Sequence, residues 1–382
     1  MSGALRVVQV SFHRDVERRE PRWLIEDWPT LTRIAVAAAS PQCHVEVVQA
    51  CEQDLSVQLV GVPVHFVRQT SAADGLSIRV GSKLSAAARV LNRVAEIKPH
   101  VVHVNGLDYP LQLLRLRRRL PQAAIVVQDH AGSPATGWRK ALHRRALAKV
   151  NAALFCASEQ ARPFFESGTL RPDLPVFEVL EDSSLFVAGD QKDARRRSGI
   201  HGDPCLLWLG RLDAVKDPLG VLDAVAMASD HLPGARLWCC YRDAPLEGQV
   251  KARMAADPRL RERAVLLGPR PHAEVETLCQ AADFLIQGSL REGSGYAVIE
   301  ALACGTTPLV TDIPAFRKIT KQGRFGALAT PGDAAAMSRN LIEWASKDRA
   351  RLRREARRHF EDELSYAVIG RDLRAVYEAV RR

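Results

Sequence analysis

The chain has 382 residues, of which 47% are hydrophobic and 26% charged, and it carries a formal net charge of +10 at pH 7. This length exceeds what one hydrophobic core usually spans, and the composition excludes an intrinsically disordered chain, so we expect two globular domains with a cleft between them. The positive charge favours an anionic partner, such as a nucleotide, a phospholipid, an acidic glycan or a nucleic acid, without distinguishing among them.

The first residues, MSGALRVVQVSFHRD, reach Arg6, His13 and Arg14 without the apolar core of a signal peptide. No later stretch approaches the roughly 18 apolar residues of a membrane span, and we therefore expect a cytoplasmic protein. The eight cysteines form no CxxC pair, and several lie inside apolar runs such as ALFCAS and RLWCC. This usage predicts buried thiols and neither a disulfide framework nor a zinc site.

Apolar runs rich in β-branched residues alternate with helical patterns along the chain. In the first half they are ALRVVQVSF, HVEVVQA, VHFVRQ, VVHVNG, AAIVVQDH, ALFCAS and VFEVLED, and in the second half CLLWLGRL, RLWCCYR, AVLLGP, FLIQGS and PLVTD. Such runs predict parallel strands buried on both faces, and hence two α/β units in tandem with a boundary near residues 183 to 203. From Asp333 onward the pattern is helical, and the last amphipathic segment is suited to pack back across the domain junction.

Three polar side chains of the first half lie around the ends of VVHVNG and AAIVVQDH: His103, Asn105 and His130. Ligands of open parallel sheets bind beyond the carboxyl ends of the strands, which makes these residues candidates. A single histidine in a loop is also an ordinary surface feature, and that interpretation of His130 stays open. The neighbouring Asp129 is expected either to orient His130 or to cap a turn.

The segment LLWLGRLDAVKDPLG leads from a buried strand into a loop with Arg211 and Lys216. Asp217 is placed to cap the next helix, and Pro218 suits its first position. An arginine and a lysine between a strand and a helix are suited to a diphosphate, because one offers a forked donor and the other a mobile point charge. The alternative is a pair of solvated basic residues on a surface turn.

The segment SLREGSGYAVIEALACG follows the strand FLIQGS and contains a candidate set of site residues: Glu292, Gly293, Ser294, Gly295, Tyr296 and Glu300. The glycines let backbone amides approach a ligand, and the following helix offers unpaired N–H groups to a phosphate or sugar oxygen. A separation of about 10 Å along a helix is too wide for the paired acids of a retaining hydrolase, so we expect the two glutamates to hold different parts of one extended ligand.

Together these segments resemble glycosyltransferase family 4, a large family of retaining enzymes with the GT-B fold. The match consists of the Gly-Arg-Leu loop at residues 210–212 followed by Lys216, and of Glu292 followed after seven residues by Glu300. The resemblance implies that Arg211 and Lys216 neutralise the donor diphosphate. It also implies that Glu292 holds hydroxyls of the transferred sugar and that Glu300 binds the ribose.

The resemblance further implies that His130 reaches the donor sugar from across the cleft and that the backbone near residues 268–270 lies close to the nucleotide base. His272 is expected to be a surface residue at the start of a helix. Ser294 stands where the family often has phenylalanine, which leaves the glycine cradle intact and alters the sugar pocket. The family's first strand is commonly followed by a glycine-rich loop, but VVQVSFHRDVERREPRWLIEDWPTL contains no glycine, so the acceptor end departs from the pattern.

The organisation that follows from the resemblance is α/β with the GT-B fold, in which two Rossmann-like domains face each other across a cleft. We expect an N-terminal acceptor-side domain over residues 1–184, a C-terminal nucleotide-sugar-binding domain over residues 185–364, and a last helix over residues 365–382 that returns to the first domain. The donor, a nucleotide-diphosphate sugar, is a substrate, and we expect no other cofactor.

The resemblance implies that the acceptor hydroxyl attacks the face from which the diphosphate leaves, while the leaving phosphate oxygen takes the proton. The chain contains no pair of aspartates separated by one residue, which is the usual metal-nucleotide device of the other large transferase fold. We therefore predict no essential metal.

Other classes of protein account for parts of the pattern. A dinucleotide-dependent oxidoreductase is excluded, because the first strand leads into SFHRD and not into a GxGxxG turn. A sugar-nucleotide epimerase or a sugar phosphorylase of similar shape stays open, as does a basic nucleic-acid-binding or glycan-binding protein without catalysis. Stacking aromatic residues do not accompany the basic segments, so we expect no nucleic-acid partner.

Two basic segments of the first half, around residues 111–120 and 138–150, mix leucine or alanine with dense positive charge. One interpretation is that they dock on an anionic membrane at its inner face, which would favour a lipid-linked acceptor over a soluble glycan. The other is that they are ordinary helices whose apolar side packs on the sheet and whose arginines face water. The sequence leaves both open.

Overall fold

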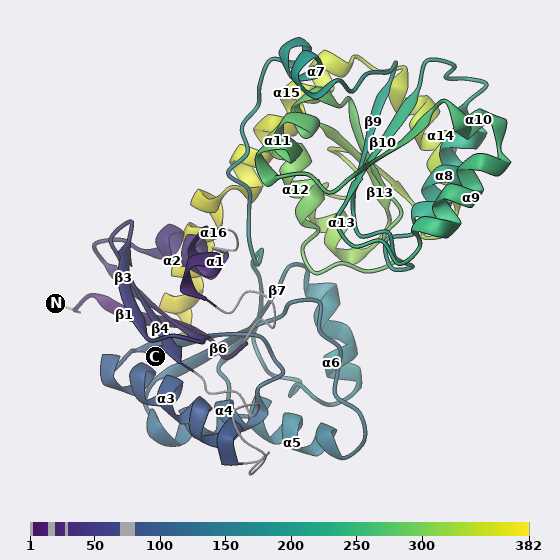
Figure 1. The fold of residues 1–382 in the computed structure, drawn as a ribbon. Helices are drawn as coiled ribbons and strands as arrows, with labels where there is room; N and C mark the ends of the chain where they lie inside the picture. The colour runs from purple at the N-terminus through teal and green to yellow at the C-terminus, as the bar shows by residue number, and fades with distance from the viewer. Residues whose placement is uncertain (1–2, 14–19, 27–29, 69–80, 382) are drawn as a thin grey trace. The chain divides into compact units, whose positions relative to one another are not determined.

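The structure is a computed structural model that describes residues 3–13, 20–26, 30–68 and 81–381, with residues 81–86 described by their backbone alone. Its internal contacts divide the chain into two compact units (Figure 1). Unit 1 comprises residues 1–182 and 366–382, and unit 2 comprises residues 183–365. Each unit is an α/β layer structure with its own sheet and its own hydrophobic core.

Within the described residues, unit 1 has a sheet of eight strands in the order β3-β4-β2-β1-β5-β6-β7-β8. The strands are β1 (Leu5–Ser11), β2 (Cys43–Cys51), β3 (Leu55–Leu59), β4 (Val62–Arg68), β5 (Val101–Asn105), β6 (Ala124–Gln128), β7 (Ala152–Phe155) and β8 (Val176–Glu178). Neighbouring strands are parallel except for β3, which pairs antiparallel with β4 at the edge. Strands β5, β6 and β7 are almost wholly buried and mainly apolar, because helices cover both faces of the sheet.

The helices of unit 1 lie on the two faces of this sheet. They are α1 (Pro21–Glu26), α2 (Thr30–Ala38), α3 (Gly81–Ile97), α4 (Pro110–Arg119), α5 (Gly137–Leu147), α6 (Arg162–Glu166), α16 (Tyr366–Val380) and the short 3-10 helix η1 (Ser158–Ala161). Helices α3, α4 and α5 cover one face, and α2 packs with α16 on the other (Figure 1). Leu91 of α3, Leu113 of α4 and Leu147 of α5 pack with the strands in one hydrophobic core.

Unit 2 has a fully parallel sheet in the order β11-β10-β9-β12-β13-β14. The strands are β9 (Cys205–Gly210), β10 (Arg236–Tyr241), β11 (Ala264–Gly268), β12 (Phe284–Gln287), β13 (Thr307–Thr311) and β14 (Ala327–Ala329). Strands β9 and β12 are neighbours although 73 residues separate the end of one from the start of the other along the chain, and their carboxyl ends therefore lie at the same edge. This adjacency brings two distant loops together.

Helices cover both faces of the second sheet as well. They are α7 (Gln191–Ser198), α8 (Pro218–Ala228), α9 (Glu247–Ala256), α10 (Pro258–Arg261), α11 (His272–Ala281), α12 (Tyr296–Ala303), α13 (Pro314–Ile319), α14 (Ala334–Ala345), α15 (Arg349–His359) and the π-helical turn η2 (Phe360–Leu364). Helices α8, α9 and α14 lie on one side of the strands and α7, α11, α12 and α15 on the other (Figure 1).

The last helix, α16, belongs to unit 1 although it follows unit 2 in the chain. Its Tyr377 is fully buried, and the hydroxyl lies 3.0 Å from Nε2 of Gln9 on β1 and 2.8 Å from Nδ1 of His103 on β5. Gly370 lets the helix approach α2, because a Cβ there would stand 1.9 Å from the carbonyl oxygen of Ala37. The helix is therefore fixed both by packing and by a buried polar network.

The structure confirms the α/β class with two sheets of mainly parallel strands and a C-terminal helix. All eight cysteines, each within the described part of the chain, are buried free thiols, as predicted. One expectation was wrong: His103 lies within β5 and is 2% exposed, so it is part of the core and not a strand-end side chain. Much of the glycine-free loop after β1, at residues 14–19 and 27–29, lies outside the described residues.

Candidate active site

One candidate site lies at the carboxyl edge of the unit 2 sheet. The loop after β9 carries Lys216, and the loop after β12 carries Glu292. Lys216 Nζ lies 2.5 Å from Glu292 Oε1, and the hydroxyl of Ser289 donates to the same carboxylate oxygen at 2.6 Å. The amide of Leu290 donates to the carbonyl oxygen of Val215 at 2.8 Å, which ties the two loop backbones together. The structure thus places a cation beside an acid that the chain separates by 76 residues.

Arg211 extends from the start of the same loop, with 59% of its side chain exposed. It pairs with Asp213 at 3.0 Å and lies 3.7 Å from Asp243. The guanidinium is therefore held near the sheet edge by carboxylates and is accessible to an anionic ligand. The predicted helix start is confirmed, because the Asp217 carboxylate accepts from the Gly220 amide at 3.0 Å and Pro218 is the first residue of α8.

The glycine cradle connects β12 to α12 over Gly293, Ser294 and Gly295, and Tyr296 begins the helix. Gly295 has φ of +68°, and a Cβ there would lie 2.7 Å from the ring of Phe316. Any other residue at this position would need both a strained backbone and a shift of that ring. The sharp turn leaves the N-terminal amides of α12 at the sheet edge, where they are suited to an oxygen-rich anion.

Glu300 lies about one helical turn after Tyr296 on α12, and 16% of its side chain is exposed. Nε2 of His272 lies 2.7 Å from its Oε1, and the His272 ring packs against Phe186 with ring centroids 4.6 Å apart. His272 is the first residue of α11 and 64% exposed, as a surface helix start should be. Its contact with Glu300 was not predicted, because the two residues come from different elements and no local pattern connects them.

A separate group of candidate residues lies in unit 1, around His130 in the loop after β6. Nδ1 of His130 contacts a carboxylate oxygen of Glu181, and Nε2 contacts Oδ1 of Asn105 at the end of β5. Burial lowers the pKa of His130, but the hydrogen bond and the charge of Glu181, together with the charges of Asp129 and Asp182, outweigh it, so that the pKa is raised above its usual value. Glu181 itself is 11% exposed in its side chain, and no local sequence pattern predicted its contact with His130.

Asp129 precedes His130 and is 8% exposed. Its Oδ1 accepts from the Gly132 amide at 3.0 Å, which identifies it as a turn cap. Burial raises its pKa to about 6. Of the two roles left open for Asp129, the structure therefore supports the cap, while the side chain that orients His130 is Glu181.

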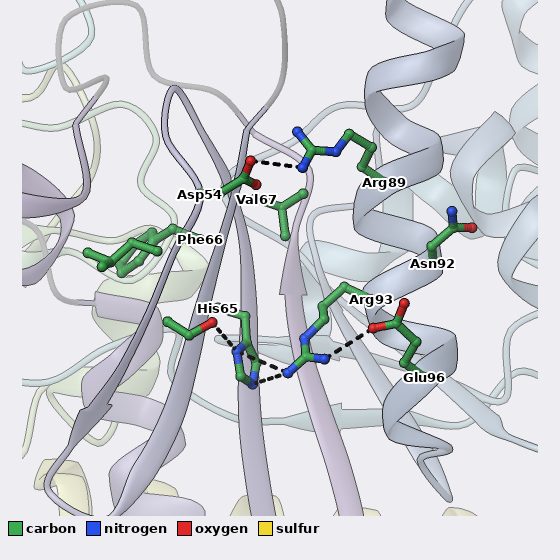
Figure 2. Close-up of a pocket in the computed structure, with 10 residues that line it drawn as sticks. Asp54, His65, Phe66, Val67, Arg89, Asn92, Arg93 and Glu96 are labelled. Atoms are coloured by element: carbon green, nitrogen blue, oxygen red, sulfur yellow. Dashed lines mark hydrogen bonds and ion pairs between the residues drawn. The ribbon is translucent and has the colours of Figure 1, made fainter.

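A polar cavity of about 460 Å³ lies elsewhere in unit 1, between the β3–β4 hairpin and α3 (Figure 2). Arg89 pairs with Asp54 at 2.8 Å, and Arg93 pairs with Glu96 at 3.1 Å and lies 3.2 Å from Nε2 of His65. Its charges are thus paired among themselves, and none of the predicted site residues lines it.

Over the described ranges, no group of three or more histidine, cysteine, aspartate or glutamate side chains is arranged to hold a metal ion. Over the same part of the chain, every helix is too short or too polar to cross a lipid bilayer.

The two α/β units, each built on a sheet of mainly parallel strands, have the GT-B fold. Residues 190–359 match the model of the family described as glycosyl transferases group 1. The protein is therefore a glycosyltransferase that uses nucleotide-sugar donors.

The chain is 25% identical over 289 residues to GDP-mannose:cellobiosyl-diphosphopolyprenol alpha-mannosyltransferase of Xanthomonas oryzae pv. oryzae (strain PXO99A), across 74% of this chain and 71% of that protein. Sucrose-phosphate synthase from Thermosynechococcus elongatus has a similar fold, with a TM-score of 0.73 and 16% identity over 98% of this chain and 99% of that one. Anabaena HepE in complex with UDP aligns with a TM-score of 0.72 and 15% identity over 98% and 100% of the two chains.

Proposed function

We propose that the protein transfers a hexose from a nucleotide-diphosphate sugar to a glycan or lipid-linked acceptor, with retention of the anomeric configuration and without a metal ion. The observation that carries this proposal is the pair of Lys216 and Glu292, whose charged groups lie 2.5 Å apart at the edge where β9 and β12 end. A diphosphate needs a cation, and the attached sugar needs a hydrogen-bond acceptor beside it. The pair offers both next to each other.

The proposed roles divide along the length of the donor. Arg211 and Lys216 neutralise the diphosphate, which is the reason for proposing that no metal is required. The amides of Gly293, Ser294, Gly295 and Tyr296 hold phosphate or sugar oxygens, and Glu300 accepts from the ribose hydroxyls once His272 gives way. Glu292 accepts from hydroxyls of the transferred sugar, and His130 donates to a hydroxyl of a substrate.

The reaction that suits these groups is attack of the acceptor hydroxyl on the face of the sugar from which the diphosphate departs. The bond from the anomeric carbon to the diphosphate oxygen breaks as the bond to the acceptor oxygen forms, and the departing oxygen takes the acceptor proton. The protein then contributes positioning and a fixed electrostatic field in place of a covalent nucleophile. Arg211, Lys216 and the start of α12 stabilise the negative charge that develops on the leaving group.

The relatives guide the choice of donor and acceptor. The Xanthomonas oryzae protein is named for GDP-mannose and a lipid-linked disaccharide, and the Anabaena structure contains UDP. By analogy with the former, we propose a mannosyl or related hexosyl donor and an acceptor carried on a lipid diphosphate in the assembly of a cell-surface polysaccharide. Calorimetric titration of GDP, UDP, GDP-mannose and UDP-glucose into the full chain in EDTA tests the donor. Binding of at least one nucleotide supports the proposal, and failure of all of them contradicts it.

A lipid-linked acceptor would place the enzyme at the cytoplasmic face of a membrane, and one surface of unit 1 fits such a location. Trp138 at the start of α5 is 82% exposed and is followed by the exposed Arg139 and Lys140, and the exposed Arg144 and Arg145 lie about two helical turns after Trp138. An exposed tryptophan within a basic surface suits the interface of an anionic membrane, where each cation contributes about 1 kcal/mol. We propose peripheral docking through this surface of α5 and through the exposed Arg118 of the neighbouring α4.

Sedimentation with vesicles of phosphatidylglycerol and phosphatidylcholine tests the docking. Binding should fall with salt and should be lost when Arg118, Arg144 and Arg145 become Glu. Arg117 is left intact, because its guanidinium donates to the carbonyl oxygens of Lys149, Pro121 and Ala123 and thus holds the fold. The matched control reverses three exposed arginines of α15 in unit 2: Arg351, Arg354 and Arg358. Equal binding by both triple variants would contradict the docking surface.

A further inference from the structure

Several carboxylates lie near His130, and the proposed reaction assigns no role to them. Glu181 contacts Nδ1 of His130, and Asp182 and Asp129 add their charges to its surroundings. Glu181 and Asp182 are 8% and 4% exposed. Two acids buried in succession are costly unless each has a partner or a function, so their placement needs an explanation.

The backbone that carries Glu181 is anchored on both sides. The carbonyl oxygen of Leu180, the preceding residue, accepts from Nε2 of Gln128 at the end of β6 at 3.3 Å. On the other side, the hydroxyl of Tyr366, the first residue of α16, donates to the Asp182 carboxylate at 2.5 Å. Glu181 is thus held between a strand of the sheet and the last helix, which limits its freedom to leave the imidazole.

The two ring nitrogens of His130 face different partners. Nδ1 faces the buried carboxylate of Glu181, whereas Nε2 faces the neutral amide oxygen of Asn105. One third of the His130 side chain is exposed, so a ligand hydroxyl can replace the amide oxygen at Nε2. A carboxylate on one nitrogen fixes the orientation of the ring and the proton on Nδ1, and leaves the other nitrogen as the one that meets a ligand.

We propose that Glu181 is a positioning residue that holds His130 as an imidazolium whose Nε2–H is presented to a hydroxyl of a substrate. This inference rests on the proposed function, because it assigns His130 a hydrogen-bond donor role in that reaction. The consequence is a positive charge at the substrate-facing nitrogen of His130, set by a carboxylate from a separate segment of unit 1.

The surrounding groups determine how this arrangement depends on pH. From the loop after β6 comes Asp129, whose pKa burial raises to about 6, and from the segment after β8 come Glu181 and Asp182. From β5 comes His103, whose burial lowers its pKa to about 3 and keeps it neutral. The imidazolium of His130 is therefore favoured by carboxylates, and its loss as pH rises should reduce turnover.

The direct test is an NMR titration of the histidine side chains of the full chain, with the His130 signal assigned from the His130→Asn variant. In the unmodified protein the pKa of His130 should lie above the usual 6.5. In Glu181→Gln the hydrogen bond and the charge of Glu181 are lost while the opposing effect of burial stays, so the pKa of His130 should fall, and Glu181→Asp should restore part of the difference. An unchanged pKa in Glu181→Gln would overturn the proposal, whether or not a donor has been identified.

Kinetics supply the second arm of the test. Glu181→Gln should lower kcat by about tenfold or more, as the loss of an orienting carboxylate behind a functional histidine does elsewhere. The alkaline limb of its pH–rate profile should move to lower pH, while affinity for the nucleoside diphosphate stays within twofold. Glu166→Gln, an exposed acid of the same unit, is the matched control and should change nothing. A shifted pKa with normal turnover would overturn the positioning role, whereas absence of transfer by the unmodified protein would instead contradict the proposed function.

Discussion

Lys216 Nζ lies 2.5 Å from Glu292 Oε1, and this contact joins the loop after β9 to the loop after β12. Both groups are shielded from water, with 23% and 10% of their side chains exposed. A donor that binds here would bring its own negative charge to Lys216 and its own hydroxyls to Glu292. In the protein without ligand, the two side chains instead pair with each other.

Replacing Arg211 or Lys216 with Ala should weaken binding of a nucleoside diphosphate and leave the fold intact. A charge-assisted contact to phosphate contributes about 1.5 to 3 kcal/mol, so each variant should lose about tenfold or more in affinity. Calorimetry measures the change, and Lys251→Ala on the exposed surface of α9 is the control for the loss of a cation. Unchanged affinity in both site variants would refute their assignment to the diphosphate.

The two glutamates should differ in what they bind. Glu292→Gln should reduce turnover by about tenfold or more with little effect on binding of free nucleoside diphosphate, because the proposed ligand of Glu292 is the transferred sugar. Glu300→Ala should impair both turnover and binding, because the proposed ligand of Glu300 is the ribose. Titration of the nucleoside diphosphate into each variant distinguishes them, and equal losses of affinity would show that the roles are wrong.

Tyr377→Phe should destabilise unit 1. The variant removes one buried hydroxyl and leaves Gln9 and His103 without it, which should cost about 1 to 3 kcal/mol in the free energy of unfolding. Denaturant unfolding followed by circular dichroism measures the cost. Tyr241→Phe is the comparison, since the partner of its hydroxyl, Glu247, is 39% exposed and can turn to water. Equal losses in the free energy of unfolding of the two variants would show that the buried hydrogen bonds of Tyr377 stabilise the protein no more than the hydrogen bond of Tyr241 to Glu247.

His103 should make the protein less stable in mild acid. Burial lowers its pKa to about 3, so between that value and the usual 6.5 the unfolded chain binds a proton that the folded chain does not. The contribution of His103 to the free energy of unfolding is therefore fully present above pH 6.5. It declines by about 1.4 kcal/mol per pH unit as the pH falls below that value. Urea unfolding at pH 7.5 and 5.0 should show a smaller pH effect in His103→Asn than in the unmodified chain. An identical effect in both would exclude His103 as the cause.

The sequence predicted those features that depend on local pattern. Uninterrupted apolar runs identified strands such as β5, β6 and β9, and the capping pair of Asp217 and Pro218 located the start of α8. The strands that the pattern missed are short or exposed. Strand β3 lies at the edge of its sheet and its side chains are largely exposed, and β14 has only three residues. Neither has the apolar run that burial on two faces imposes.

The partners of the site residues could not be predicted, because they depend on which strand ends become neighbours. Lys216 and Glu292 meet since β9 lies beside β12, and His272 meets Glu300 through the packing of α11 beside α12. The Glu181 contact with His130 needs β6, β7 and β8 to lie side by side. A pattern along one segment carries no information about these long-range pairings.

The central claim is that the protein is a metal-independent retaining glycosyltransferase, and proton NMR of the reaction tests it most directly. GDP-mannose and UDP-glucose would each be incubated in EDTA with the full chain and a lipid-linked cellobiosyl diphosphate, and the anomeric signal of the first product recorded. The account predicts release of the nucleoside diphosphate from one donor and a product with the donor's own anomeric configuration. An inverted product, or transfer that appears only when a divalent metal is restored, would contradict it.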